Sequence, residues 1–104
     1  MNNIKNTEEQ FKILRKIDKK PNLTQRELAE ELGFSLGKLN YCLVELKKKG
    51  LVKIQSFKNN PSKIRYVLTP RGISLRTKLT VDFMNRKMKE YDELKKELDQ
   101  FKSK

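Results

Sequence analysis

The chain of 104 residues is long enough for one domain with an extension. Its 25 lysines and arginines against 13 acids give a net charge of +12, which favours a polyanionic partner such as DNA, RNA or an anionic membrane face. With no histidine and a single cysteine, the composition excludes histidine-based catalysis, an internal disulfide and a cysteine-only metal site.

The sequence also lacks the signals of other classes. Its N-terminus is polar, without the apolar core of a signal peptide, and no apolar run approaches the length of a membrane span. We therefore expect a cytoplasmic protein with no membrane partner. No acid–base pair, nucleophile or metal constellation occurs, so we expect no enzyme, no cofactor and no metal.

The first predicted helix begins at Thr7, where Gln10 three residues later completes a capping box. Apolar residues then follow at helical spacing. The helix should end near Lys19–Lys20, because Pro21 disfavours helical backbone in the residue before it.

The stretch Thr24–Gly50 predicts two short helices joined by a sharp turn. Thr24 and Glu27 form a capping box for the first helix, and Gly33 ends it in the left-handed conformation that glycine adopts readily. Ser35 caps the second helix, and Gly50 closes it.

One face of this second helix should pack into the core. Leu39, Cys42, Leu43 and Leu46 lie on it at helical spacing. Cys42 is therefore interpreted as a core residue and not as a redox sensor, because a buried thiol is usually inert. Lys47–Lys49 is interpreted as a solvated helix end.

Two strands follow, over Leu51–Ser56 and Lys63–Leu68, with turn residues at Lys58–Pro61 between them. They form a hairpin. Thr69 then caps a last helix, with Pro70 in its first position, and no strong stop follows before the end of the chain. Such a helix would be about 50 Å long.

In its first part, the last helix can pack on the compact domain with Ile73, Leu75, Leu79 and Phe83. Its distal part carries an apolar stripe that nothing else in the chain can cover. Its spacing is heptad-like, so we expect a second copy to cover it in a homodimer. The dimerisation residues are Met84, Met88, Tyr91, Leu94, Leu98 and Phe101. The alternative is a helix folded back onto its own domain.

The order helix–helix–helix–strand–strand–helix predicts a mainly α fold with a small β-hairpin. It describes a winged helix-turn-helix over residues 1–69 and a long C-terminal dimerisation helix over 70–104. On TQRELAEELGFS at 24–35, LVELKKKG at 43–50 and LTPRG at 68–72, the sequence resembles the MarR family of bacterial transcription regulators. The runs SLGKLNYCL, KNNPSKIRYVLTPRGI and FMNRKMKEYDELKKEL resemble its small EPS-associated branch, found with exopolysaccharide loci.

The resemblance implies a sequence-specific double-stranded DNA-binding regulator, with a link to exopolysaccharide gene control. Larger MarR proteins carry longer flanking helices that build a dimer and an effector pocket. This chain has one helix before the motif and one after it, so an aromatic-acid or drug pocket is not implied. The wing also lacks the Asp-Arg pair common in the larger family.

Candidate DNA contacts follow from docking geometry, in which the N-terminal residues of the second helix meet base edges. Asn40 can pair bidentately with adenine, Lys38 can reach a guanine or a phosphate, and Tyr41 can reach a phosphate or a thymine methyl. The first residues of the preceding helix form a phosphate seat, and the wing cations reach backbone or minor groove. The full set is Thr24, Gln25, Arg26, Ser35, Leu36, Gly37, Lys38, Asn40, Tyr41, Lys58, Lys63 and Arg65.

Two alternatives stay open. Asn40 could be a solvated helix residue without a partner base. The whole chain could instead be a winged-helix protein–protein interaction module, with the last helix as a coiled-coil docking arm.

Overall fold

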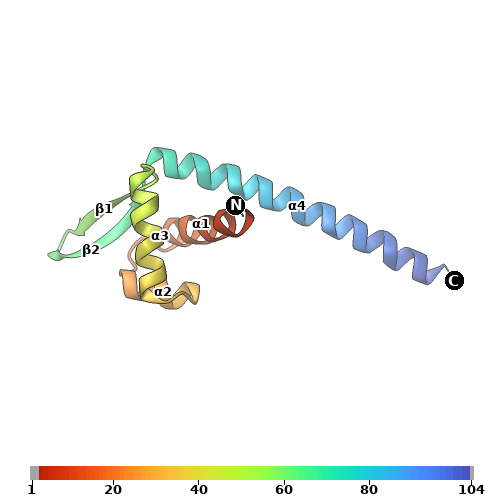
Figure 1. Cartoon of the computed structure of the whole chain (residues 1–104), viewed down its shortest axis with the longest axis horizontal. Helices are drawn as coiled ribbons and strands as arrows, with labels where there is room; N and C mark the ends of the chain where they lie inside the picture. Colours follow the sequence, from red (N-terminus) through yellow and green to blue (C-terminus); the bar gives the residue numbers. More distant parts are fainter. Residues whose placement is uncertain (1–2, 104) are drawn as a thin grey trace.

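The computed structural model describes residues 3–103, so the outermost residues of the two expected units, 1–2 and 104, lie outside the described residues. The elements run in the order α1 (Asn3–Lys19), α2 (Gln25–Leu32), α3 (Leu36–Lys48), β1 (Val52–Phe57), β2 (Asn60–Leu68) and α4 (Pro70–Lys102). Figure 1 shows α1 to α3 and the hairpin gathered together, with α4 running far beyond them, and the longest dimension is 65 Å. The predicted mainly α fold with a small β-hairpin and a long last helix is confirmed.

The start of α1 was predicted wrongly. The helix begins at Asn3, so Thr7 lies inside it and does not cap it. The preceding residues contain no proline or glycine that would stop a helix, so it continues past the capping signal. Its end at Lys19, close to Pro21, agrees with the prediction.

The core lies where α1, α2, α3, the base of the hairpin and the first part of α4 meet. Its buried side chains are Ile13, Leu14, Ile17, Leu28, Ala29, Leu39, Leu43, Leu46, Leu51, Val52 and Leu79. The predicted core face of α3 is confirmed for its three leucines. Cys42 lies at the edge of this core, partly buried, where loss of solvation and the nearby Glu9 carboxylate raise the pKa of its thiol.

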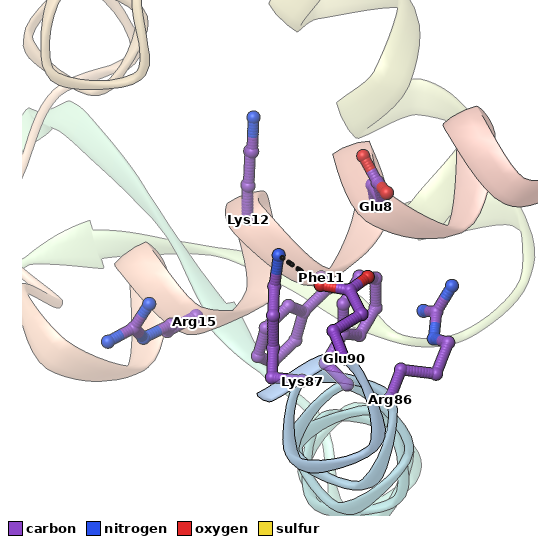
Figure 2. A pocket seen from close by; sticks show the side chains of 8 residues that line it. Glu8, Phe11, Lys12, Arg15, Arg86, Lys87 and Glu90 are labelled. Carbon is purple, nitrogen blue, oxygen red and sulfur yellow. Dashed lines mark ion pairs between the residues drawn. The ribbon is translucent and has the colours of Figure 1, made fainter. Parts of the chain in front are cut away.

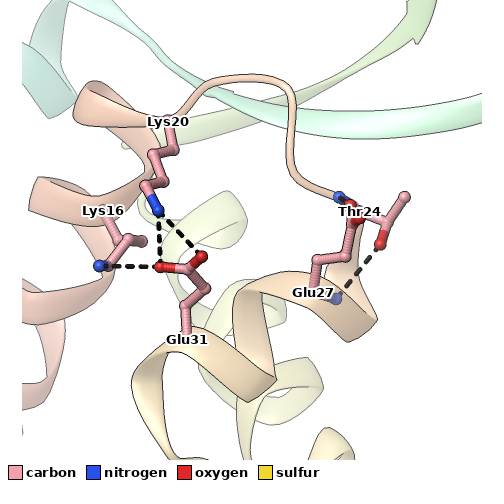
Figure 3. A network of polar contacts seen from close by, with 5 residues as sticks. All are labelled: Lys16, Lys20, Thr24, Glu27 and Glu31. Carbon is pink, nitrogen blue, oxygen red and sulfur yellow. Dashed lines mark hydrogen bonds and ion pairs between the residues drawn. The ribbon is translucent and has the colours of Figure 1, made fainter.

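The caps of α2 are those that the sequence predicts. The Thr24 hydroxyl accepts a bond of 3.2 Å from the Glu27 backbone N–H, and the Glu27 carboxylate accepts one of 2.8 Å from the Thr24 N–H (Figure 3). Gly33 has a φ of 72°, and the Phe34 N–H closes the helix on the Ala29 carbonyl at 3.0 Å. This glycine turn sets the angle between α2 and α3.

A second polar cluster joins α1 to α2. The Glu31 carboxylate lies 3.2 Å from Lys16 Nζ and 2.9 Å from Lys20 Nζ (Figure 3). These hydrogen bonds hold the pKa of Glu31 below its usual value. All three groups contact solvent, so these ion pairs add little to the free energy of folding. Their main effect is to orient α1 relative to α2.

The hairpin differs from the prediction at its tip. β1 runs one residue further than expected, to Phe57, and β2 begins at Asn60, so the turn is shorter than predicted. The register shifts there, since Ser56 pairs with Ile64 whereas Phe57 pairs with Asn60. Pro61 can lie in β2 because each strand of a two-stranded sheet has a free edge.

The start of α4 is joined closely to the turn between α3 and β1. The Thr69 hydroxyl donates to the Gly50 carbonyl at 2.6 Å and accepts from the Gly72 N–H at 3.0 Å. Thr69 N–H also donates to the Leu51 carbonyl at 3.1 Å. Gly72 lies so near that a Cβ built on it would be 2.0 Å from the Leu51 carbonyl oxygen. Only glycine permits this approach of two backbones.

The first part of α4 packs on the domain, as predicted for Leu79 and Phe83. The Phe83 ring stacks on Phe11 of α1 with centroids 4.8 Å apart. Ile73 was expected to pack there as well, but its side chain is 52% exposed because it lies on the helix face turned away from the core.

Beyond the stacked rings, α1 and α4 border an open hollow of about 270 Å³. Figure 2 shows charged side chains from both helices around it, with Lys87 and Glu90 paired on α4 at 3.7 Å. The lining residues are Glu8, Phe11, Lys12, Arg15, Phe83, Arg86, Lys87 and Glu90. From Met84 to Ser103, the side chains of α4 and its cap are exposed.

We predict that Gly72→Ala lowers the free energy of unfolding by about 3 kcal/mol, because the added methyl overlaps the Leu51 carbonyl. Gly37→Ala is the matched control, since a Cβ there meets nothing within 4 Å, and it should raise stability by about 0.5 kcal/mol. Urea denaturation of both variants measures the difference. Equal stabilities would contradict the close approach described here.

Candidate nucleic-acid interface

The outward face of α3 lies opposite the buried leucines. This face carries five residues at helical spacing, which are Gly37, Asn40, Tyr41, Val44 and Lys48. Tyr41 is 69% exposed and Val44 41%, so this face offers a phenol and an isopropyl group to an incoming ligand. Val44 was missed by the sequence reasoning, although its position three residues after Tyr41 is a signal that could have identified it.

Lys38 points away from this face. Its ammonium lies 2.6 Å from the Glu9 carboxylate of α1 and 4.4 Å from the centre of the Phe34 ring. The side chain therefore lies on the flank of α3 with much of its charge compensated. Ser35, beside it, is the N-cap of α3, because its hydroxyl accepts the Lys38 backbone N–H at 3.1 Å. Leu36 is 40% exposed at the same end of the helix.

The start of α2 reaches α3 through a pair of amides. Gln25 Nε2 donates to Asn40 Oδ1 at 3.3 Å. Gln25 is the first residue of α2, directly after the Thr24 cap, and Arg26 beside it is exposed. This bond holds the N-terminus of α2, which was predicted to bind a phosphate, next to the outward face of α3, which was predicted to contact bases.

The wing cations gather around one aromatic ring. Lys63 Nζ lies 5.0 Å and the Arg65 guanidinium 5.4 Å from the centre of the Phe57 ring. Arg65 also donates to the Gln55 side chain at 3.0 Å and to the Asn22 side chain in the connector before α2. Lys58 borders the same hollow as these groups.

The wing therefore lies beside the start of α2. Hydrogen bonds from Thr24 are the main reason that the pKa of Glu27 is lowered, and the Lys63 charge contributes to the same shift. Sequence reasoning missed Phe57, Gln55 and Asn22. Gln55 and Phe57 could have been identified from their positions on the strand that pairs with the one carrying Lys63 and Arg65.

The structure thus brings three of the predicted groups together. Asn40 contacts Gln25 at the start of α2, and Arg65 contacts the connector that precedes it. Lys38 is not part of this arrangement. Proteins contact phosphates with positively charged side chains, and they contact base edges with amides and apolar side chains. All of these occur on this surface.

The six residues predicted for dimerisation lie far from this surface, on α4 beyond Phe83. Their exposed fractions run from 51% for Leu98 to 73% for Phe101. The stripe is longer than predicted, because Val81 is also exposed, at 45%, and lies on the same helix face as Met84 and Met88. Among residues 3–103, no helix is both long enough and apolar enough to cross a membrane.

Comparisons with known proteins place these features in a family of folds. Residues 10–53 match the model of a winged helix-turn-helix DNA-binding family. The matched residues include α2, α3 and part of α1. A comparison with curated protein sequences gave no significant match.

The similar solved structures include transcription regulators of the MarR family. One MarR family regulator superposes with a TM-score of 0.68 at 23% identity, over 88% of this chain and 68% of its own. A mutant of Staphylococcus aureus MepR bound to an oligodeoxyribonucleotide gives 0.69 at 22% identity, over 91% and 76%. A mutant of E. coli MarR complexed with operator DNA gives 0.61 at 30% identity, over 67% and 50%. The chain therefore has a MarR-like winged helix-turn-helix fold.

Proposed function

We propose that this chain, with its MarR-like winged helix-turn-helix fold, is a sequence-specific double-stranded DNA-binding transcription regulator that acts as a homodimer in the cytoplasm. The observation that carries the proposal is the meeting of three surfaces: the outward face of α3, the start of α2 and the wing cations. Gln25 at the start of α2 donates to Asn40 on α3. Arg65 of the wing donates to Asn22 in the connector before α2. The net charge of +12 supplies the attraction to a polyanion.

In this proposal α3 is the recognition helix and lies in the major groove. Asn40 contacts a base edge, Tyr41 and Val44 pack on thymine methyl groups, and Gly37 lets the backbone approach closely. Ser35 and Leu36 lie at the entry of the helix into the groove. Lys38 reaches DNA only by exchanging the Glu9 carboxylate for a phosphate.

The remaining contacts go to the sugar–phosphate backbone. The start of α2, with Thr24, Gln25 and Arg26, faces a phosphate, since a helix N-terminus favours an anion. The wing brings Lys58, Lys63 and Arg65 to the backbone or the minor groove. The DNA-bound structures of MepR and MarR support this docking by analogy of fold.

We further propose a division of labour, with residues 1–69 binding DNA and residues 70–104 joining two copies. The apolar stripe of α4 repeats every three to four residues, the spacing of a two-helix seam. Residues 84–103, which carry the stripe, hold six basic and five acidic side chains, so two identical helices meet with little net repulsion. The partner of the stripe is a second α4.

Asn40→Ala should cost about 1–3 kcal/mol on the preferred sequence and relax the preference at one base pair, because a base-edge contact is lost. Lys63→Ala should instead weaken binding to all sequences and lower the salt slope by about 0.9, since one phosphate contact is removed. Titration of both variants against selected and scrambled duplexes at several salt concentrations separates the two effects. An equal loss of Asn40→Ala binding on every sequence would argue against base readout.

The double variant Leu94→Gln with Leu98→Gln should convert the dimer to a monomer. Its affinity for a duplex with two half-sites should fall by at least about tenfold, because the two DNA-binding domains are no longer linked. Lys89→Gln with Glu93→Gln, on the opposite helix face and also without change of net charge, should leave both properties intact. Light scattering combined with gel shifts at low salt measures them. A monomeric wild-type chain without affinity for DNA would favour the protein–protein interaction module.

The sequence resemblance to EPS-associated regulators leads us to propose that exopolysaccharide genes are the target. Fragments of the source genome recovered on the immobilised chain should then be enriched for DNA upstream of such genes. Enrichment of unrelated promoters alone would reject this target while leaving DNA binding intact.

A further inference from the structure

In the hydrogen bond between Gln25 and Asn40, the two side-chain amides have different roles. Gln25 Nε2 is the donor and Asn40 Oδ1 the acceptor, at 3.3 Å. An asparagine amide has one oxygen that accepts and one nitrogen that donates. With its oxygen turned to Gln25, Asn40 turns its nitrogen away from α2.

Without this bond the amide of Asn40 would have no fixed orientation. The last torsion of an asparagine side chain is broad and close to two-fold, so its oxygen and nitrogen exchange places easily. Asn40 is exposed on α3 and the core does not hold it. The backbone of Gln25 is fixed by its place as the first residue of α2, directly after the Thr24 cap, and its half-buried side chain presents Nε2 to Asn40.

We propose that Gln25 is a specificity-determining positioning residue, which turns the amide nitrogen of Asn40 towards the DNA groove. This inference rests on the proposed function. In the major groove the acceptors are purine N7, guanine O6 and thymine O4, whereas cytosine N4 and adenine N6 are donors. An outward N–H₂ group therefore selects a base that presents acceptors, best of all guanine, which presents two.

The direction of the bond can be reversed by one substitution. Gln25→Glu keeps the length of the side chain but offers only acceptors. Its carboxylate should bind the Asn40 nitrogen, so that the oxygen of Asn40 turns outwards and prefers a base with a donor, such as cytosine. Gln25→Ala removes the bond and should leave the amide free to rotate.

The test is selection of bound duplexes from a random pool, carried out with the full chain and four variants. Asn40→Ala identifies the base pair that Asn40 reads. At that base pair Gln25→Ala should lower the wild-type preference by about tenfold, and Gln25→Glu should move it from an acceptor-presenting to a donor-presenting base. Glu30→Ala, exposed on the same helix, should change nothing.

Preference is a ratio within one variant, so a uniform loss of affinity from the added carboxylate cancels. Circular dichroism and thermal unfolding confirm that each variant is folded, and a merely structural role of Gln25 would move those readouts and not the base preference. Wild-type preference retained in both Gln25 variants would overturn the inference while the proposed function stands. A wild-type chain that selects no sequence would overturn both.

Discussion

The arrangement of the whole molecule depends on the contact between the start of α4 and the turn that ends α3. Gly72 brings the backbone of α4 against the Leu51 carbonyl, and the Thr69 hydroxyl joins the Gly50 carbonyl to the Gly72 N–H. Both strands of the wing begin or end at this point, since Val52 pairs with Leu68. One joint therefore fixes the directions of α3, the wing and α4 relative to each other, and a residue larger than glycine at position 72 would displace all three.

Local signals were sufficient for most of the fold. The caps at Thr24, Ser35 and Thr69 and the left-handed turn at Gly33 depend on residues within a few positions, so the sequence carries them directly. Prediction failed where no such signal exists. The start of α1 has no residue that stops the helix, and the exposure of Ile73 depends on how α4 meets a domain that is distant in sequence.

The candidate site was harder to predict for the same reason. Residue types predicted which face of α3 points outwards, but side-chain directions depend on neighbours from other elements. Lys38 turns to Glu9 because α1 places a carboxylate within 2.6 Å of it. The pairing of Gln25 with Asn40, across 15 residues, and the stacking of two cations on Phe57 likewise arise only when helices and strands have been assembled.

The stacked rings of Phe11 and Phe83 have a mechanical consequence. Among the side chains that the structure describes, those of α4 and its cap are exposed from Met84 to Ser103, so this stacking is the point about which the outer part of the helix can tilt. The far end of α4 lies about 29 Å beyond Phe83 at 1.5 Å per residue, so a tilt of about 10° about this contact displaces that end by about 5 Å. In the proposed dimer, the stiffness of the contact between Phe11 and Phe83 therefore limits how far apart the two recognition helices can move. It thereby limits the spacings between half-sites to which the protein can bind.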